Sequence, residues 1–166
     1  MYNVTIVGHQ RVGKSTLIHQ WRGHEFSESY YANIFVEKTE FPTMCVSEIP
    51  GSGARFINNV DPIYASTDVF VVVVRKDTSQ LPFYDELSFK YKDASWLLVT
   101  NGDDEFPNCC LYVQNRDINM THVNLKTGTG VTDSLGVLWE LTRLHPKRPI
   151  PVSLVGEVYQ MIPGCL

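Results

Sequence analysis

Residues 8–15 read Gly-His-Gln-Arg-Val-Gly-Lys-Ser, and this segment limits the possible folds more than any other feature of the chain. It matches the pattern G-x-x-x-x-G-K-[ST], in which the glycines let successive backbone N–H groups turn toward an anion. The short apolar run Val4–Val7 precedes it, and a segment of helical pattern, from Lys14 to about Arg22, follows it. The sequence therefore predicts a phosphate-binding loop between the first strand and the first helix.

The residue types of this loop suit the phosphates of a nucleotide. A helix N-terminus supplies unpaired N–H groups and partial positive charge. Lys14 is expected to reach the β- and γ-phosphates, and the Ser15 hydroxyl to bind Mg²⁺. The alternative is a chance match with a solvated Lys14, which the flanking strand and helix argue against. The predicted phosphate-binding residues are Gly8, Gln10, Arg11, Val12, Gly13, Lys14, Ser15 and Thr16.

Composition narrows the range of partners. The 166 residues suit one domain with its own core, and the formal net charge of −4 argues against a nucleic-acid partner. The longest apolar stretch, about Val69 to Val74, is too short for a transmembrane segment. Neither a signal peptide nor a zinc-binding cysteine pattern is visible, so we expect a cytoplasmic protein with reduced thiols.

Apolar periodicity predicts alternating strands and helices, and hence an α/β fold with a parallel sheet. The chain divides into a nucleotide-binding domain, residues 1–145, and a Pro-containing tail, residues 146–166, whose pattern allows one short helix. Thr132 or Asp133 is expected to cap the last helix of the domain. Strands are expected at residues 4–7, 35–41, 43–46, 69–74, 96–99 and 122–125, and helices at 14–22, 81–91 and 131–144.

Three downstream segments carry a family resemblance. Residues 26–35 read F-S-E-S-Y-Y-A-N-I-F, Arg55-Phe56 follows, and Tyr64 to Asp68 leads into the valine run. With the phosphate loop, these segments resemble the Ras-like small GTPases over nearly the whole chain, and the Rab branch most. The resemblance implies the three-layer P-loop NTPase fold of small-GTPase type, with about six mostly parallel strands flanked by helices. It also implies binding of GTP or GDP with Mg²⁺, and protein effectors or regulators that bind the switch loops.

Two segments resemble the family's base-binding motifs. Asn101-Gly102-Asp103-Asp104 is similar to N-K-x-D, so Asn101 and Asp104 are expected to bind guanine, with Gly102 lacking the lysine stem that packs on the base. A simple turn at 101–103 is the alternative. Asn124-Leu125-Lys126 lies where the family has Ser-Ala-Lys. The Leu125 N–H would then meet the guanine oxygen and Lys126 would cover the base. Because the stretch between Asn101 and Lys126 is short, we expect its helix to be trimmed or lost.

Other positions depart from the family. Asn33 replaces the threonine that closes on Mg²⁺, and the family's D-x-x-G aligns with residues 48–51, with Glu48 or Ile49 at the aspartate. The metal ligands are expected to be Ser15, Asn33 and Glu48. Ser52, the one catalytic candidate, is a poor replacement for the glutamine that orients water. We therefore expect weak or absent hydrolysis in a Rab-like interaction module for signalling or trafficking.

Two alternatives stay open: an active switch that needs a partner for hydrolysis, and a nucleotide-free scaffold. The chain ends Pro163-Gly164-Cys165-Leu166, which is no evident prenylation motif.

Overall fold

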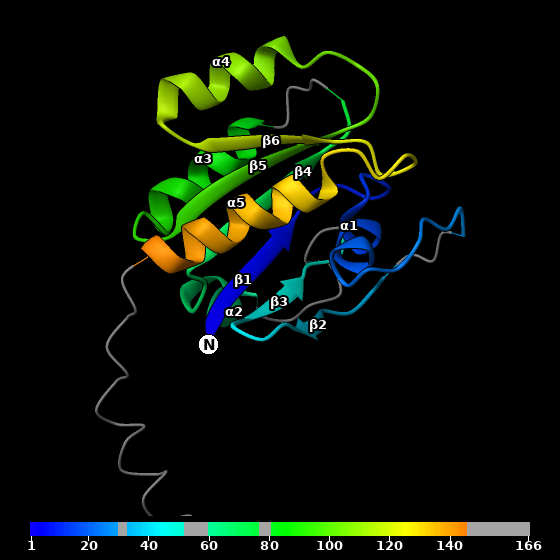
Figure 1. Ribbon diagram of the computed structural model, residues 1–166. Coiled ribbons are helices and arrows are strands. Elements are labelled where there is room, and N and C mark those ends of the chain that lie inside the picture. Colours follow the sequence, from blue (N-terminus) through cyan, green and yellow to red (C-terminus); the bar gives the residue numbers. More distant parts are fainter. Residues whose placement is uncertain (30–32, 52–59, 77–80, 146–166) are drawn as a thin grey trace, which may run out of the picture.

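The computed structural model describes residues 1–29, 33–51, 60–76 and 81–145, which form an α/β fold (Figure 1). Ser52, Arg55-Phe56 and the tail 146–166 lie outside the described residues. A six-stranded sheet is flanked by five helices. The strands are β1 (Tyr2–Val7), β2 (Glu37–Glu40), β3 (Met44–Glu48), β4 (Val69–Val74), β5 (Ser95–Asn101) and β6 (Asn119–Val123). The helices are α1 (Lys14–Trp21), α2 (Asp61–Ala65), α3 (Leu81–Lys90), α4 (Pro107–Arg116) and α5 (Val131–Leu144).

The strand order is β2-β3-β1-β4-β5-β6, and every neighbouring pair is parallel except β2 and β3. The predicted α/β fold with a mostly parallel sheet of six strands is confirmed. Because β1, β3, β4, β5 and β6 are parallel, their carboxyl ends meet at one edge of the sheet. The loops that follow these strands therefore gather at this edge, where ligands usually bind in open α/β sheets.

The valine run of β4 separates two hydrophobic clusters. Val69, Val71 and Val73 pack into a cluster with α1 and α5, whereas Phe70, Val72 and Val74 pack into another with α2, α3 and α4. All six side chains are buried, as expected for a strand covered on both faces. In Figure 1, α1 and α5 lie together over one face of the sheet. The molecule is thus built in three layers.

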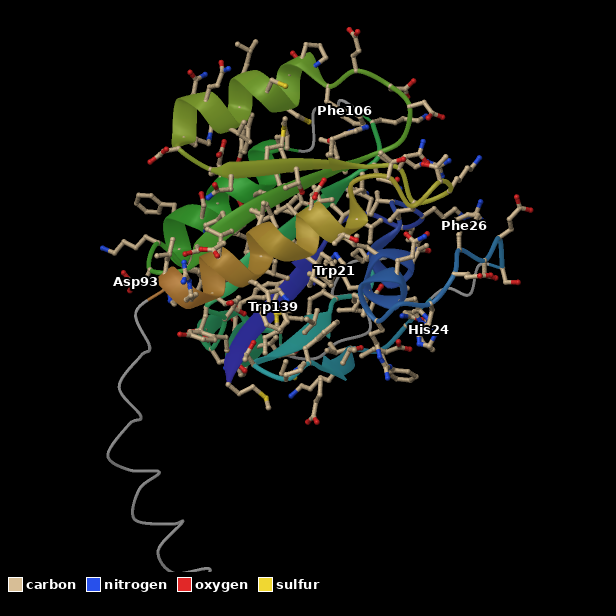
Figure 2. The ribbon with its side chains drawn as sticks, in the orientation of Figure 1. Trp21, His24, Phe26, Asp93, Phe106 and Trp139 are labelled. Atoms are coloured by element: carbon tan, nitrogen blue, oxygen red, sulfur yellow. The ribbon has the colours of Figure 1, made fainter. Side chains whose placement is uncertain are left out.

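A buried hydrogen bond joins the two helices of that face. The indole Nε1 of Trp21 donates to Ser134 Oγ at 3.0 Å, and Trp21 lies between α1 and α5 (Figure 2). Trp21 is 6% exposed, so the indole N–H would be left without water if Ser134 were absent. The contact holds α1, and with it the loop before α1, against the rest of the domain.

Two helices differ from the sequence expectations. The stretch whose helix was expected to be trimmed or lost contains α4, which begins at Pro107, so the helix is not lost; α2 was not predicted. Proline is tolerated in the first turn of a helix because its missing N–H has no partner there. Both helices bury few side chains: α4 buries Cys109 and Val113, and α2 buries Tyr64, so neither shows a strong periodic pattern.

The boundaries after β5 also differ from the expected ones. The last strand ends at Val123 rather than Leu125, because Asn124 Oδ1 accepts hydrogen bonds from the N–H groups of Lys126 and Thr127 and turns the chain. Neither Thr132 nor Asp133 caps α5. Its N-cap is Gly130, with no side-chain cap.

None of the helices within the described ranges combines the length and the apolar character that a membrane crossing requires.

Candidate functional site

A pocket of about 620 Å³ lies at the carboxyl edge of the sheet. It joins the loop after β1 to the ends of β3 and β5 and to the loop after β6. Gly8 and Val12 belong to the same loop but do not line this pocket, and the placement of Ser52 is not described. The other predicted site residues all line it: Gln10, Arg11, Gly13, Lys14, Ser15, Thr16, Asn33, Glu48, Asn101, Asp104, Leu125 and Lys126.

Lys14 lies within the curve of the loop. Its Nζ donates to the carbonyl oxygens of Gly8 at 3.0 Å and His9 at 2.9 Å, and the side chain is almost fully buried. Burial lowers the pKa of Lys14, although the charge of Glu48 opposes this shift. An ammonium group has three donors, so these two bonds leave one for an anion. The loop is therefore shaped around the Lys14 side chain.

The N-terminus of α1 points into the pocket. Gly13 is its N-cap, with φ of 105°, and no side chain of the described residues caps the helix. A Cβ at Gly13 would lie 2.5 Å from Leu125 Cδ1, so a larger residue would be both strained and obstructed. The first N–H groups of α1 consequently remain unpaired by side chains, which is the arrangement that binds anions.

Gly51, which lies after β3, packs closely against the phosphate loop. A Cβ at Gly51 would lie 2.3 Å from the backbone nitrogen of Gln10 and 2.5 Å from the carbonyl carbon of His9. Such distances are impossible for a real side chain, so the segment after β3 contacts the phosphate loop through bare backbone. The sequence marked Gly51 as part of a family motif but did not show this contact.

Glu48, and not Ile49, faces the pocket. The Ser15 hydroxyl donates to Glu48 Oε1 at 2.7 Å, and Asn33 Nδ2 donates to Oε2 at 3.4 Å. Ile49 instead packs into the hydrophobic cluster under α2, α3 and α4. Strand alternation explains the difference, because successive side chains point to opposite sides. Three predicted metal ligands are thus brought together.

The environment of Glu48 resists its ionisation. Burial is the largest effect and raises the pKa of Glu48, although the hydrogen bond from Ser15 and the charge of Lys14 act against it. Glu37, directly opposite Glu48 in the β2–β3 register, raises it further. A divalent cation beside Glu48 would offset the cost of keeping this carboxylate charged in a buried position.

The donor set at Glu48 fits Mg²⁺. Ser15 offers a hydroxyl, Asn33 an amide and Glu48 a carboxylate, and Mg²⁺ prefers oxygen ligands. Among the described residues no cluster of three or more His, Cys, Asp or Glu is arranged to hold a metal. This agrees with the usual mode for Mg²⁺, which is held by one or two carboxylates together with phosphate oxygens and water. Bound there, the ion would neutralise phosphate charge.

Asn101 connects the two ends of the pocket. Its Nδ2 donates to the carbonyl oxygen of Val12 at 2.9 Å, and its Oδ1 accepts from the N–H of Leu125 at 3.2 Å. The side chain is nearly buried, so both hydrogen bonds are sheltered from water. One amide group thereby fixes the phosphate loop relative to the loop after β6.

This geometry changes the expected role of the Leu125 backbone. The N–H of Leu125 was expected to meet a base oxygen, but it donates to Asn101 instead. Of the two acids after β5, Asp103 accepts a 2.5 Å hydrogen bond from Asn124 Nδ2, whereas Asp104 is exposed and lines the pocket. Lys126 is exposed at the same end of the pocket.

Several lining residues were not among the predicted site residues, and two of them, Phe26 and Arg75, have large side chains. Phe26, labelled in Figure 2, is half-buried against the cluster under α1 and α5 and lines the pocket. Arg75 lies directly after β4 and also lines it. The available signals were the family aromatic at Phe26, which was noted only as part of a motif, and the position of Arg75 at the carboxyl end of a buried strand.

No protein-family model matches this chain, and a search of curated proteins finds no match to it either. The function proposed below therefore rests on the residues of the pocket.

Proposed function

We propose that the chain is a Rab-like small GTP-binding protein that binds GTP or GDP with Mg²⁺ and hydrolyses GTP weakly or not at all. The fold would then be the P-loop NTPase fold of small-GTPase type. The observation that carries the proposal is that one pocket holds Lys14 and Ser15 at one end and Asn101, Asp104 and Lys126 at the other. A nucleotide needs both a phosphate site and a base site, joined at a fixed distance.

The phosphate end supports a chelated di- or triphosphate. Lys14 and the N-terminus of α1 supply positive charge, and Ser15 with Glu48 supplies oxygen ligands for Mg²⁺. Because Lys14 is already held by Gly8 and His9, little side-chain entropy is lost when phosphate binds.

The base end supports guanine over adenine. Asp104 is exposed to the pocket, and a carboxylate there can accept hydrogen bonds from the N1–H and the exocyclic amine of guanine. Adenine lacks these donors on that edge, so it would leave the carboxylate desolvated and unpaired. The buried Asn101 would keep this end in place relative to the phosphates.

Slow hydrolysis follows from the groups around the γ-phosphate position. Phosphoryl transfer depends on positioning and charge stabilisation. Asn33 directs an amide N–H at Glu48, where the family closes a threonine on the metal. Glu48 itself is one methylene longer than aspartate and contacts Ser15 directly. Each misplaced group is expected to cost about one to three powers of ten in rate.

The surface near the pocket supports a protein-binding role. Ile34 and Phe35, which precede β2, are 50% and 69% exposed. Large apolar side chains exposed together beside an edge strand are a common feature of protein interfaces. They follow Asn33, so an effector there would contact the segment that lines the nucleotide pocket.

Chromatography of nucleotide released from the purified protein tests the proposal. GDP or GTP in near-stoichiometric amount is the expected result. A titration with a fluorescent GDP analogue, with and without Mg²⁺, gives the affinity, and competition with ADP gives the specificity. Lys14→Ala should abolish binding, while Lys90→Ala, which removes an exposed lysine paired with Asp61, should not. The proposal is refuted if the purified protein releases no nucleotide and shows no binding in the titration, and if Lys14→Ala gives the same result as the wild type.

A nucleotide-free scaffold is the second candidate. It is favoured by the internal hydrogen bonds of the phosphate loop, because Lys14 donates to the carbonyl oxygens of Gly8 and His9, and Ser15 donates to Glu48. The same chromatography distinguishes the two, since a scaffold releases no nucleotide.

A further inference from the structure

The base end of the pocket lacks a side chain at one position. Gly102 follows Asn101 at the end of β5 and lines the pocket, but it offers nothing to cover the face of a planar base. A Cβ built at Gly102 would have open space around it: apart from its chain neighbours, the one atom of the described residues within 4 Å is the backbone carbonyl oxygen of Arg75, at 3.9 Å. Arg75 is therefore the residue next to this gap.

The sheet register explains why Arg75 lies there. Val74 pairs with Thr100, so Arg75, directly after β4, lies beside Asn101, the last residue of β5. The Arg75 side chain is exposed and lines the pocket. Its Nη1 approaches the carbonyl oxygen of Arg11 at 3.5 Å, so the guanidinium extends from the end of β4 to the phosphate loop.

We infer that Arg75 covers one face of the bound base and takes the place of the side chain that Gly102 lacks. This inference rests on the proposed nucleotide-binding function. A guanidinium is planar, always charged and weakly hydrated, so it stacks on an aromatic ring more favourably than an ammonium group does. The contact of Nη1 with the Arg11 carbonyl oxygen places the guanidinium at the wall of the pocket. Arg75 acts on the base, whereas Lys14 acts on the phosphates.

Competition binding separates the two roles. The wild type and the variants are titrated with a fluorescent GDP analogue, which is then displaced by GDP or by inorganic tripolyphosphate. Arg75→Ala should weaken GDP about five- to twenty-fold and leave tripolyphosphate within about two-fold, because only GDP carries a base. Arg75→Lys keeps the charge but loses the plane, and should fall between the wild type and Arg75→Ala.

Lys76→Ala is the matched control. It removes a neighbouring exposed cation that does not line the nucleotide pocket, so affinity for both ligands should stay within about two-fold of the wild type. Arg75 is exposed, so its variants are expected to fold, which thermal unfolding verifies.

Two results would overturn the inference alone: equal weakening of GDP and tripolyphosphate by Arg75→Ala, which indicates a phosphate contact, or no weakening of either. In both cases the proposed function is still supported if the wild type binds GDP and Lys14→Ala does not. A wild type that binds no GDP refutes both proposals.

Discussion

The hydroxyl of Ser15 donates a 2.7 Å hydrogen bond to Glu48 and so ties the first turn of α1 to the end of β3. The two residues are, with Asn33, the proposed ligands of Mg²⁺. Under the proposed function they would hold the ion, which would offset phosphate charge, and the carboxylate charge of Glu48 would make nucleotide binding depend on Mg²⁺.

Glu48→Gln should reduce that dependence. The amide keeps nearly the shape of the carboxylate and can accept from Ser15, but it carries no charge to attract the cation. We expect the ratio of GDP affinities with and without Mg²⁺ to fall about ten-fold or more toward one, equivalent to about 1.4 kcal/mol. The measurement is a fluorescent-GDP titration in Mg²⁺ and in EDTA.

Glu37→Gln is the control for this change. It removes a negative charge from the residue opposite Glu48 in the sheet, but Glu37 is exposed and does not line the pocket. The ratio should remain near that of the wild type. If Glu37→Gln and Glu48→Gln lower it equally, general electrostatics rather than metal ligation is responsible.

Asn101→Ala should destabilise the whole domain. It removes the donor to the Val12 carbonyl and the acceptor of the Leu125 N–H, both buried. The expected loss in free energy of unfolding is about 2–4 kcal/mol, since each abandoned buried group costs about 1–3 kcal/mol. Urea unfolding measures it. Asn124→Ala removes hydrogen bonds that are more exposed to water, so it should lower the free energy of unfolding clearly less. An equal loss would contradict the view that Asn101 fixes the phosphate loop relative to the loop after β6.

Gly51→Ala should damage the phosphate loop, because the new Cβ meets the backbone of His9 and Gln10. Rigid backbone on both sides must move, and we expect both nucleotide affinity and stability to fall, the latter by about 1–3 kcal/mol. Gly136→Ala in α5 is the opposite case: apart from the adjoining backbone of its own helix, no atom of the described residues lies within 4 Å of its Cβ. It should raise stability by about 0.5–1 kcal/mol. Thermal unfolding compares them, and a neutral Gly51→Ala would show that the loop yields freely.

The contacts of Asp85 in α3 with α4 should stabilise the fold less in acid than at neutral pH. Arg116 donates to Asp85 from Nε at 2.7 Å and from Nη2 at 2.9 Å, and Tyr112 donates to it at 2.9 Å. The bonds from Arg116, with a smaller effect from Tyr112, lower the pKa of Asp85 below its ordinary value of 3.8. An aspartate with a lowered pKa stabilises the fold above the unfolded value, and this stabilisation is lost as pH falls through the folded pKa.

Asp85→Asn should therefore cost about 0.5–1 kcal/mol at pH 7, as expected for a half-exposed pair, and progressively less as pH falls below 3.8. Urea unfolding of both proteins at several pH values measures the difference. Glu140→Gln breaks the exposed pair with Arg143 in α5 and should cost less than Asp85→Asn at pH 7. A difference for Asp85→Asn that stays constant down to the most acid pH would contradict the assignment.

Local patterns predicted much of the scaffold. The valine run of β4 and the apolar stripe of α5 appear at the predicted residues, Val69–Val74 and Val131–Leu144. Both contain enough buried residues to show their period within the element itself. The weak helices α2 and α4 do not, because few of their side chains reach the core. Their helical state depends on what they pack against.

The candidate site also has a part that the sequence predicted and a part that it did not. The eight residues from Gly8 to Ser15 are enough to predict a phosphate-binding loop, because the necessary groups are contiguous and the strand and helix beside them are local. The sequence alone left open whether Glu48 or Ile49 stands at the family aspartate, and it gave no reason to connect Arg75 with Gly102. Only the tertiary structure decided these points. Strand alternation turns Glu48 toward Ser15, and the parallel register of β4 and β5 brings together residues that are distant in the chain.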